Sequence, residues 1–269
     1  MFSAPRQVTC PYSTILGDTQ KFESNLVGGA IFSCRAGMAF DDSDKICACL
    51  PIKGFTIPKD ACSGDLLLHF PFDAHFNDVT CRHASGHVYG SGVVRIVNDT
   101  KRGKVALFDG AARIEVPFMR NWFQDQHIRG WTVSAWYKTH STRPGRGGIV
   151  DNGDCVDPST FYLHTGNGHT GHTPRVVAGI DTSDTPTRVK AVAGVANDGR
   201  WRHVVMVYDG HSLTLYVDNE VASTSVMPIT GFIENTFNPM YIGFATCFGR
   251  RGYFRGMIDE VRHITVYVT

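Results

Sequence analysis

The sequence lacks helical periodicity, long apolar runs and an excess of either charge. Apolar residues do not recur at the three- and four-residue spacing of a helix, which excludes a helical bundle. No apolar stretch approaches the roughly 18 residues of a membrane helix. Lysine and arginine number 26 against 25 aspartate and glutamate. A chain this close to neutrality has no overall field that would attract nucleic acid or a membrane, so we expect neither partner.

Signatures of catalysis are also missing. The chain contains no serine nucleophile elbow and no phosphate-binding loop. Asp259 and Glu260 are adjacent, but alternation along a strand would turn them to opposite faces. The glutamates are isolated from one another, at Glu23, Glu115, Glu220, Glu234 and Glu260. We therefore expect a protein that is not an enzyme.

The sequence does contain a clear pattern of β-strands. Residues 201–208 are rich in β-branched and aromatic side chains, as expected of a strand inside a packed sandwich. Asp209-Gly210 is a turn dipeptide, because glycine takes a positive φ without steric cost. Residues 213–217 then alternate apolar and polar side chains. This stretch predicts a β-hairpin.

Cysteine is used unevenly along the chain. The eight cysteines lie mostly in the first third, at Cys10, Cys34, Cys47, Cys49, Cys62, Cys81, Cys155 and Cys247. An even number predicts disulfides and a secreted, extracellular protein. Zinc is disfavoured, because Cys47 and Cys49 enclose one residue rather than two and no second pair follows. Asn98 opens a glycosylation sequon, which agrees with secretion.

The first 62 residues differ from the rest. They mix Gly, Ser, Asp and Cys with short apolar pieces and have no long periodic element. A segment of this size buries little core and relies on disulfides. We therefore divide the chain into a cysteine-rich segment, 1–62, and a β-sandwich, 63–269. The opening residues hold no apolar signal core, so we expect a piece of a longer secreted protein or a chain without its signal.

Segments in the right order resemble the laminin-G-like, concanavalin A-like jelly-roll family. They are residues 67–73, 105–110, 114–117, 131–136, the hairpin 198–219 and the closing segment 253–262. The resemblance implies an all-β, antiparallel jelly-roll sandwich preceded by a small disulfide-rich segment. We expect Trp131, Trp136 and His203 to face its core. The family topology also implies a Cys155–Cys247 bridge, and a Cys62–Cys81 bridge would pin the first segment to the sandwich.

Part of the first segment resembles the invertebrate chitin-binding module of the peritrophin type. Cys34, Gly37, Phe40 and Cys47 match its spacing, although two of the six family cysteines are missing. The resemblance implies a Cys34–Cys47 bridge and a chitin site, which needs aromatic faces on which sugar rings stack. The available rings are Tyr12, Phe22, Phe32 and Phe40. The favoured alternative is that these rings form the small core of the segment.

Calcium is the first cofactor to consider, because it takes several oxygens at a turn. The jelly-roll resemblance implies a rim site made by Asp151, Asp154 and Asn238. It also implies a structural site made by Asp73, Asp109 and Asp259, which we expect at strand ends on one side of the fold. The alternative is that these aspartates cap turns through their own side chains.

Histidines and arginines offer weaker candidates. Histidines at close spacing can take zinc or copper, here His164, His169 and His172, or His83 and His87. Exposed loop residues are the favoured interpretation of both groups. Arginines gather at Arg250, Arg251 and Arg255 and would suit a sulfated glycan, although a solvated loop end is favoured.

A degenerate peritrophin-like segment followed by a laminin-G-like sandwich resembles the domain order of molluscan shell-matrix proteins of the Pif type. That order implies a secreted extracellular-matrix scaffold that binds chitin or another polysaccharide. It also implies calcium carbonate biomineralisation, with mineral and other matrix proteins as partners. One alternative is a lectin-like or receptor module for cell-surface glycans or proteins. A glucanase is disfavoured, because the Glu-x-Asp-x-x-Glu strand of such enzymes is missing.

Overall fold

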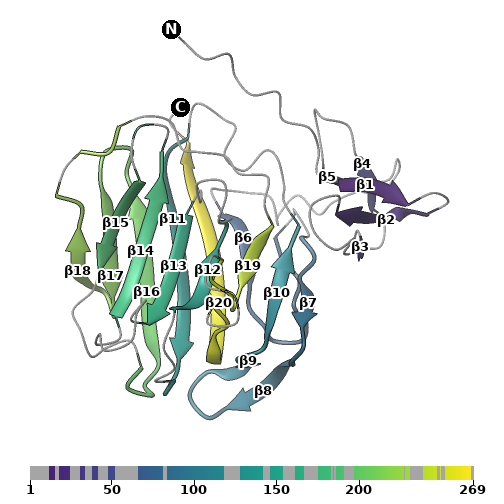
Figure 1. Ribbon diagram of the computed structural model, residues 1–269, viewed down its shortest axis with the longest axis horizontal. Coiled ribbons are helices and arrows are strands. Elements are labelled where there is room, and N and C mark those ends of the chain that lie inside the picture. The colour runs from purple at the N-terminus through teal and green to yellow at the C-terminus, as the bar shows by residue number, and fades with distance from the viewer. Residues whose placement is uncertain are drawn as a thin grey trace, which may run out of the picture.

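The computed structural model (Figure 1) describes most of the chain from residue 66 onward and five short strands before it. The described ranges are 66–80, 84–117, 128–141, 146–153, 161–166, 175–182, 184, 186–190, 197–226, 228–230, 239–246, 249 and 252–267. Only the backbone is described for 128–129, 146, 186–190, 265–267 and the strands before residue 52.

Twenty strands form the described secondary structure. The first five are β1 Tyr12–Ile15, β2 Asp18–Ser24, β3 Ile31–Ser33, β4 Met38–Asp41 and β5 Ala48–Pro51. The next eight are β6 Leu66–Phe70, β7 His87–Gly90, β8 Val94–Asp99, β9 Gly103–Asp109, β10 Ala112–Val116, β11 Ile128–Lys138, β12 Arg146–Asp151 and β13 Phe161–Gly166. The last seven are β14 Arg175–Asp181, β15 Pro186–Lys190, β16 Arg202–Tyr208, β17 Leu213–Val217, β18 Glu220–Thr224, β19 Met240–Ile242 and β20 Arg255–Tyr267.

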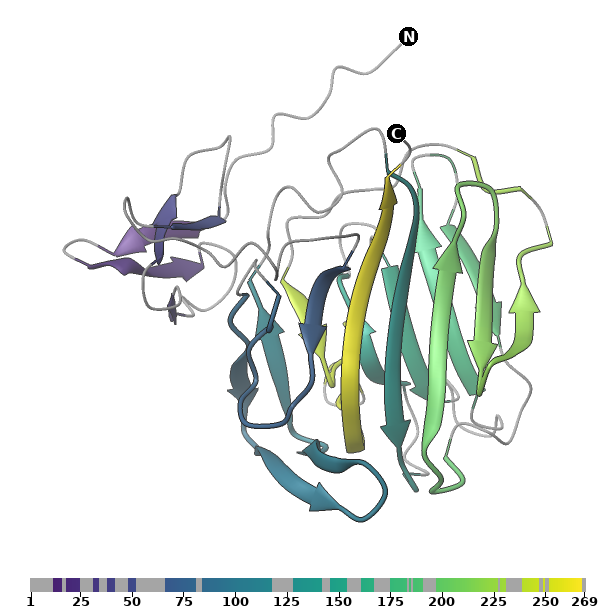
Figure 2. The same ribbon diagram turned by 180° about the vertical axis from the view of Figure 1, so that it is seen from behind.

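Strands β6 to β20 form two antiparallel sheets packed face to face (Figures 1 and 2). The seven-stranded sheet has the order β15-β14-β13-β12-β19-β10-β7. The eight-stranded sheet has the order β18-β17-β16-β11-β20-β9-β8, and β6 also pairs with β20. The predicted all-β antiparallel sandwich is confirmed. Within the described ranges no helix is long and apolar enough to cross a bilayer.

The first segment contains two small sheets, β1-β2-β3 and β4-β5. Strands β2 and β3 pair antiparallel, with Phe22 opposite Phe32. The side chains of the four aromatic residues predicted to bind chitin lie outside what the structure describes, as do all the cysteine side chains. The chitin site and the predicted bridges, Cys34–Cys47, Cys62–Cys81 and Cys155–Cys247, therefore stay predictions.

The predicted central hairpin is confirmed as strands β16 and β17. Leu213, Leu215 and Val217 are buried on its inner face. The Asp209 carboxylate accepts the backbone N–H groups of the turn at 2.7 and 2.8 Å, and Gly210 has a φ of +92°. A carboxylate that fixes the turn and a glycine that permits it together set the register of the hairpin.

The core is centred on Trp131, which is fully buried. Its ring lies 5.1 Å from the ring of Phe161, on the opposite sheet, and 5.7 Å from that of His263. Tyr208 packs against it at 6.3 Å. Aromatic contacts between the two sheets fix how they face each other. The prediction that Trp131 fills the core is confirmed.

The prediction that Trp136 and His203 also face the core is wrong. Trp136 lies five residues from Trp131, and an odd separation along a strand turns a side chain to the other face. His203 is the register partner of Trp136 and shares its face. The two rings stack at 4.8 Å on the outer face, and the Arg102 guanidinium covers Trp136 at 4.2 Å. This outer stack, made by Arg102, Trp136 and His203, covers part of the outer face over β11 and β16.

A β-bulge overturns the prediction that Asp259 and Glu260 face opposite ways. Opposite Ala135, β20 carries one extra residue, and Glu260 has a φ of +52°. The bulge turns both carboxylates to the outer face. Asp259 pairs with Arg102 at 2.6 Å, whereas Glu260 pairs with His69 at 2.6 Å.

Asp99 ties the outer stack to the hairpin between β8 and β9. Its carboxylate accepts the Trp201 indole N–H at 3.0 Å and lies 3.2 Å from the Lys138 ammonium. Burial alone would raise the pKa of Asp99, but the Lys101 backbone N–H, Trp201 and Lys138 outweigh it and lower this pKa to about 2. The ionised form of Asp99 therefore stabilises the fold.

Replacing Trp131 tests the core. We expect Trp131→Ala to lower the free energy of unfolding by about 3–5 kcal/mol, because the cavity cannot collapse between two rigid sheets. Urea unfolding at constant pH measures the change. Val226→Ala is the matched control, since Val226 is 98% exposed, and we expect it to change stability by less than about 0.5 kcal/mol. An unfolding midpoint for Trp131→Ala equal to that of the control would refute this placement of Trp131.

Replacing Asp99 tests the carboxylate below the outer stack. Because its folded pKa lies below the ordinary value, its stabilisation is complete above about pH 4 and is lost as pH falls through about 2. We expect Asp99→Asn to lower stability by about 1–3 kcal/mol at pH 7 and by progressively less below pH 4. Urea unfolding at pH 7, 4 and 2.5 measures this, with the exposed Asp73→Asn as control. A pH-independent loss would contradict the assignment.

Candidate functional site

A row of polar and aromatic residues crosses the outer face of the seven-stranded sheet. Glu115 of β10 is the register partner of Tyr241 of β19, Tyr241 is the partner of Asp151 of β12, and Asp151 is the partner of Tyr162 of β13. The residues on each side of Tyr241, Met240 and Ile242, belong to the core. Alternation therefore points the row away from the core.

Arg113 lies two residues before Glu115 on β10 and therefore shares its outer face. Its Nε donates to Glu115 at 2.7 Å, and a second guanidinium N–H also contacts that carboxylate. Its Nη1 donates to the Tyr253 hydroxyl at 2.8 Å. A guanidinium has five N–H donors, so these three bonds fix its orientation and leave two donors without a partner among the described residues.

Three partly exposed rings surround this guanidinium, and we call them the aromatic platform: Tyr241, Phe244 and Tyr253. The Tyr241 and Phe244 rings meet edge to face at 5.8 Å, and the Phe244 and Tyr253 rings lie 4.7 Å apart. The Arg113 Cζ lies 4.8 Å from the Phe244 centroid and 5.4 Å from that of Tyr241. The cation–π contacts hold the rings and the guanidinium as one unit.

A close backbone approach at Gly148 lets the platform form. Phe244 and Tyr253 face each other across a β-bridge, and the Gly148 N–H donates to the Gly252 carbonyl at 3.1 Å. A Cβ at Gly148 would lie 2.1 Å from the backbone carbonyl of Phe244. Only glycine at this position allows β12 to pass beneath the turn that carries two of the three rings.

The electrostatics of the platform come from a largely buried ion pair. Glu115 is only 6% exposed, and burial raises its pKa, although Arg113 beside it acts in the opposite direction. Burial and then the Glu115 carboxylate raise the pKa of Tyr89, whose backbone pairs with that of Arg113. The pair is therefore neutral overall and sits below rings that are themselves uncharged. Such a surface suits a neutral polar ligand better than an ion.

Asp151, predicted to bind calcium at the rim, is instead buried in a hydrogen-bond network. Its carboxylate lies 2.6 Å from the His164 Nε2 and accepts the Thr246 backbone N–H at 3.0 Å. It also accepts the Gly153 N–H at 2.6 Å. Its two oxygens are directed at protein donors rather than at the rim. The other two predicted ligands, Asp154 and Asn238, lie outside the described residues, so the rim site stays a prediction.

The three aspartates predicted to form a structural calcium site do not come together. Asp109 caps a turn by accepting the N–H groups of Val93 at 2.7 Å and Ala111 at 2.9 Å. Asp259 lies in the middle of β20 and pairs with Arg102, whereas Asp73 is exposed. Among the side chains that the structure describes, no three His, Cys, Asp or Glu residues form a group able to hold a metal. That prediction is wrong, because the carboxylates serve turns and an ion pair.

The predicted metal-binding histidines are not loop residues where the structure describes them. His164 is a buried residue of β13, and its ring stacks on that of Tyr162 at 4.7 Å. His87 is a partly exposed residue of β7. His83, His169 and His172 lie outside the described ranges, as do Arg250 and Arg251. Asn98 is exposed on the edge strand β8, so its glycosylation stays a prediction.

The sequence predicts a binding role neither for the rings of the platform nor for Arg113. The sequence pattern predicts Tyr253 only as the first residue of the closing segment, and it predicts no role for Arg113. The one local signal in the sequence is that Arg113 and Glu115 are the polar members of an otherwise apolar strand, β10. The platform itself joins β10, β19 and the start of the closing segment, which lie up to 140 residues apart along the chain. No local pattern reports such a contact.

Comparison with known proteins agrees with the fold. A model of the concanavalin A-like lectin/glucanases superfamily matches residues 109–267. No curated protein sequence matches the chain. Domain 4 of AbnA, a GH43 extracellular arabinanase from Geobacillus stearothermophilus in complex with arabinotriose, is similar at a TM-score of 0.57 and 17% identity, over 76% of this chain and 94% of that one.

Binding domains of botulinum neurotoxins are similar as well. The neurotoxin DC binding domain in complex with SialylT has a TM-score of 0.53 and 10% identity, over 76% of this chain and 48% of that one. A neurotoxin type C structure, whose cell entry depends on two ganglioside molecules, has a TM-score of 0.54 and 10% identity, over 76% and 49%. The chain thus spans about half the length of these toxin domains. At such identities the likeness shows the fold alone.

Replacing Asp151 tests the buried network. In Asp151→Asn an amide N–H₂ replaces one acceptor oxygen and faces donors, so we expect a loss of about 2–4 kcal/mol in the free energy of unfolding. Thermal and urea unfolding with and without millimolar calcium measure it, with Asp73→Asn as control. Calcium that stabilised the native chain, with the effect lost in Asp151→Asn, would favour the rim site over a purely structural network.

Proposed function

The chain belongs to the concanavalin A-like lectin/glucanases superfamily, and we propose that it binds a glycan through the aromatic platform of its seven-stranded sheet. The observation that carries this proposal is the Arg113 guanidinium, fixed among three rings with two N–H donors that no described residue accepts. The ligand class is a neutral, polar saccharide.

The chemistry of sugars fits this arrangement. A pyranose or furanose ring presents C–H patches that pack on aromatic faces and hydroxyl groups that accept hydrogen bonds. The platform offers both elements in one place, rings at Tyr241 and Phe244 and donors at Arg113. Because Glu115 and Tyr253 already hold the guanidinium, binding orders few further side chains. Preorganisation of this kind favours recognition of a weakly interacting ligand.

Similar structures support the ligand class. The arabinanase domain is described with arabinotriose, and the toxin domains with SialylT or as dependent on gangliosides. These ligands belong to those proteins. The shared fold makes saccharide binding a reasonable use of the same scaffold here, and the platform provides a place for it.

We further propose that the bound glycan is not cleaved. Glycosidases need two carboxyl groups that reach one bond, one of them free to give a proton. In the row on this face, Glu115 is engaged by Arg113, and Asp151 is engaged by His164 and Thr246. Both carboxylates are almost fully covered. Release of reducing sugar from a bound glycan would refute this part of the proposal.

The identity of the glycan and the setting are finer hypotheses. Chitin as ligand, a secreted location, and a role in a calcified matrix with mineral and protein partners come from the sequence resemblances described above. A lectin-like or receptor module for cell-surface glycans or proteins is the second hypothesis. The similar toxin domains favour it, because those proteins are described with SialylT, with gangliosides or with rat synaptotagmin II.

Single replacements of platform rings test the proposed function. We expect Tyr241→Ala and Phe244→Ala each to weaken glycan binding about 5- to 30-fold, as loss of one stacking ring costs about 1–2 kcal/mol. Calorimetry with chitotriose, arabinotriose and a sialylated trisaccharide measures affinity after a glycan array has selected among them. Val221→Ala on β18 is the control, because this side chain is 62% exposed and lies on the other sheet.

Two results would overturn the platform as the binding site. One is that no glycan on the array binds the native chain. The other is that a glycan binds but its affinity is the same in Tyr241→Ala, Phe244→Ala and the control, while melting curves show all three variants folded. Cleavage would appear separately as release of reducing sugar.

A further inference from the structure

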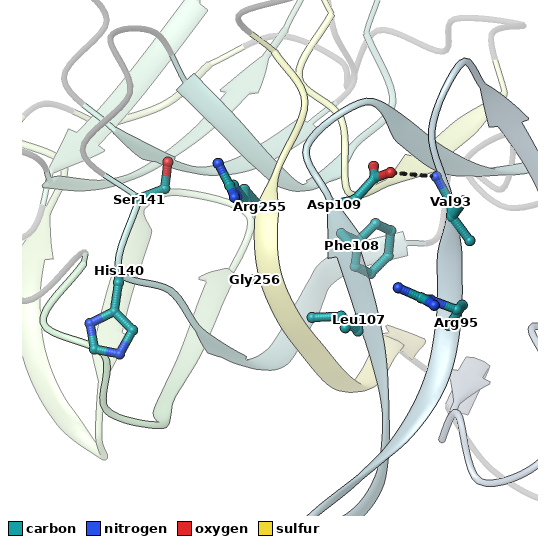
Figure 3. Close-up of a pocket in the computed structure, with 9 residues that line it drawn as sticks. All are labelled: Val93, Arg95, Leu107, Phe108, Asp109, His140, Ser141, Arg255 and Gly256. Atoms are coloured by element: carbon teal, nitrogen blue, oxygen red, sulfur yellow. Dashed lines mark hydrogen bonds between the residues drawn. The ribbon is translucent and has the colours of Figure 1, made fainter.

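A cavity of about 560 Å³ opens on the eight-stranded sheet, away from the aromatic platform (Figure 3). Strands β8, β9 and β20 and the residues that follow β11, His140 and Ser141, surround it. Figure 3 shows Arg95 and Arg255 on either side of the strand that carries Leu107 and Asp109. The cavity therefore places two cations around a partly apolar floor.

Strand register explains why these side chains share one face. Arg95 is the partner of Leu107, and Asp109 is the partner of Arg255. The alternate residues of β9, Ala106 and Phe108, belong to the core. Leu107 and Asp109, with their partners, therefore project to the outer side of the sheet.

The walls of the cavity are fixed by hydrogen bonds. The Asp109 carboxylate holds the Val93 N–H at 2.7 Å, as Figure 3 shows. The Thr139 hydroxyl donates to the Arg255 carbonyl at 2.6 Å and joins β11 to β20. Asn197 donates to the Ser141 carbonyl at 3.2 Å. The backbone around the cavity is thus held in place without a ligand.

The charge of this cavity is what distinguishes it. Other arginines of the same sheet are matched to carboxylates: Arg102 to Asp259, Arg202 to Asp198 and Asp218, and Arg262 to Glu260. Arg95 and Arg255 are exposed, and no acidic side chain within the described ranges forms an ion pair with either. The one carboxylate lining the cavity, Asp109, already accepts two backbone N–H groups. Two guanidinium groups thus remain available to an anion.

We propose that this cavity binds an acidic sugar unit of a glycan, with its carboxylate or sulfate held by Arg95 and Arg255. Guanidinium groups bind such planar or tetrahedral oxyanions through paired N–H donors. The side chains of Val93 and Leu107 provide an apolar floor for the sugar ring, and the volume is that of an ordinary ligand pocket. The inference rests on the proposed function only for the saccharide nature of the ligand, because the platform lies on the other sheet.

Charge removal tests this assignment. A heparin-derived tetrasaccharide, trigalacturonate, neutral chitotriose and inorganic sulfate are titrated calorimetrically into the native chain and into Arg95→Gln, Arg255→Gln and the double variant. We expect an acidic oligosaccharide to bind the native chain, to bind each single variant about tenfold more weakly, and not to bind the double variant measurably. Binding should weaken with rising salt. Arg175→Gln is the matched control, an exposed arginine of the seven-stranded sheet.

The outcomes separate this cavity from the platform. Equal acidic-sugar affinity in the double variant and in Arg175→Gln would overturn the proposal, as would a native chain that binds none of the acidic oligosaccharides. Inorganic sulfate binding as tightly as the oligosaccharides would overturn the saccharide assignment. Failure of the platform would appear elsewhere, as unchanged neutral-glycan binding in Tyr241→Ala.

Discussion

Strand β20 is the constraint on which the sandwich depends. It pairs with β11 along nearly its whole length, while its other edge takes β9 over its first residues and β6 after the bulge at Glu260. Figure 2 shows it running beside β11 through the sheet. Its inward residues include His263, whose ring lies 5.5 Å from that of Phe161 and thereby joins the two sheets. A strand with three partners fixes the register of each partner, and this register decides which side chains lie next to one another on the outer face of the sheet.

The outward-facing arginines show how the fold uses charge. Arg102 and Arg113 each form an ion pair with a well-covered carboxylate and pack over aromatic rings. Their positive charge therefore stabilises the fold and orients the neighbouring side chains. Arg95 and Arg255 have no such partner among the described residues and remain in contact with solvent. One residue type therefore builds two different surfaces, one neutral and aromatic, the other cationic. The difference is whether a covered carboxylate pairs with the guanidinium, as Asp259 does with Arg102 and Glu115 with Arg113.

Sequence patterns predicted the local features well. The Asp209-Gly210 hairpin and the all-β sandwich depend on nearest neighbours and on period-two alternation, so the sequence pattern predicted both correctly. The prediction for Trp136 was wrong, although its odd separation from Trp131 along one strand already indicated that it faces outward. The bulge at Glu260 could not be predicted, because no sequence pattern indicates a positive φ at a glutamate. The Asp151–His164 pair and the platform join separate strands, and a single sequence carries no signal for such contacts.

The two proposed surfaces are positioned by one short segment. Tyr253 belongs to the platform and Arg255 to the cavity, while Phe254 between them is buried. Its ring meets Phe108 at 6.1 Å and Tyr137 at 6.4 Å, both edge to face, so the chain is anchored where it passes from one sheet to the other. Alternation alone would turn Tyr253 and Arg255 to the same side, so they reach different faces because the chain changes sheets between them. The packing of Phe254 in the core therefore holds the one segment that both surfaces share.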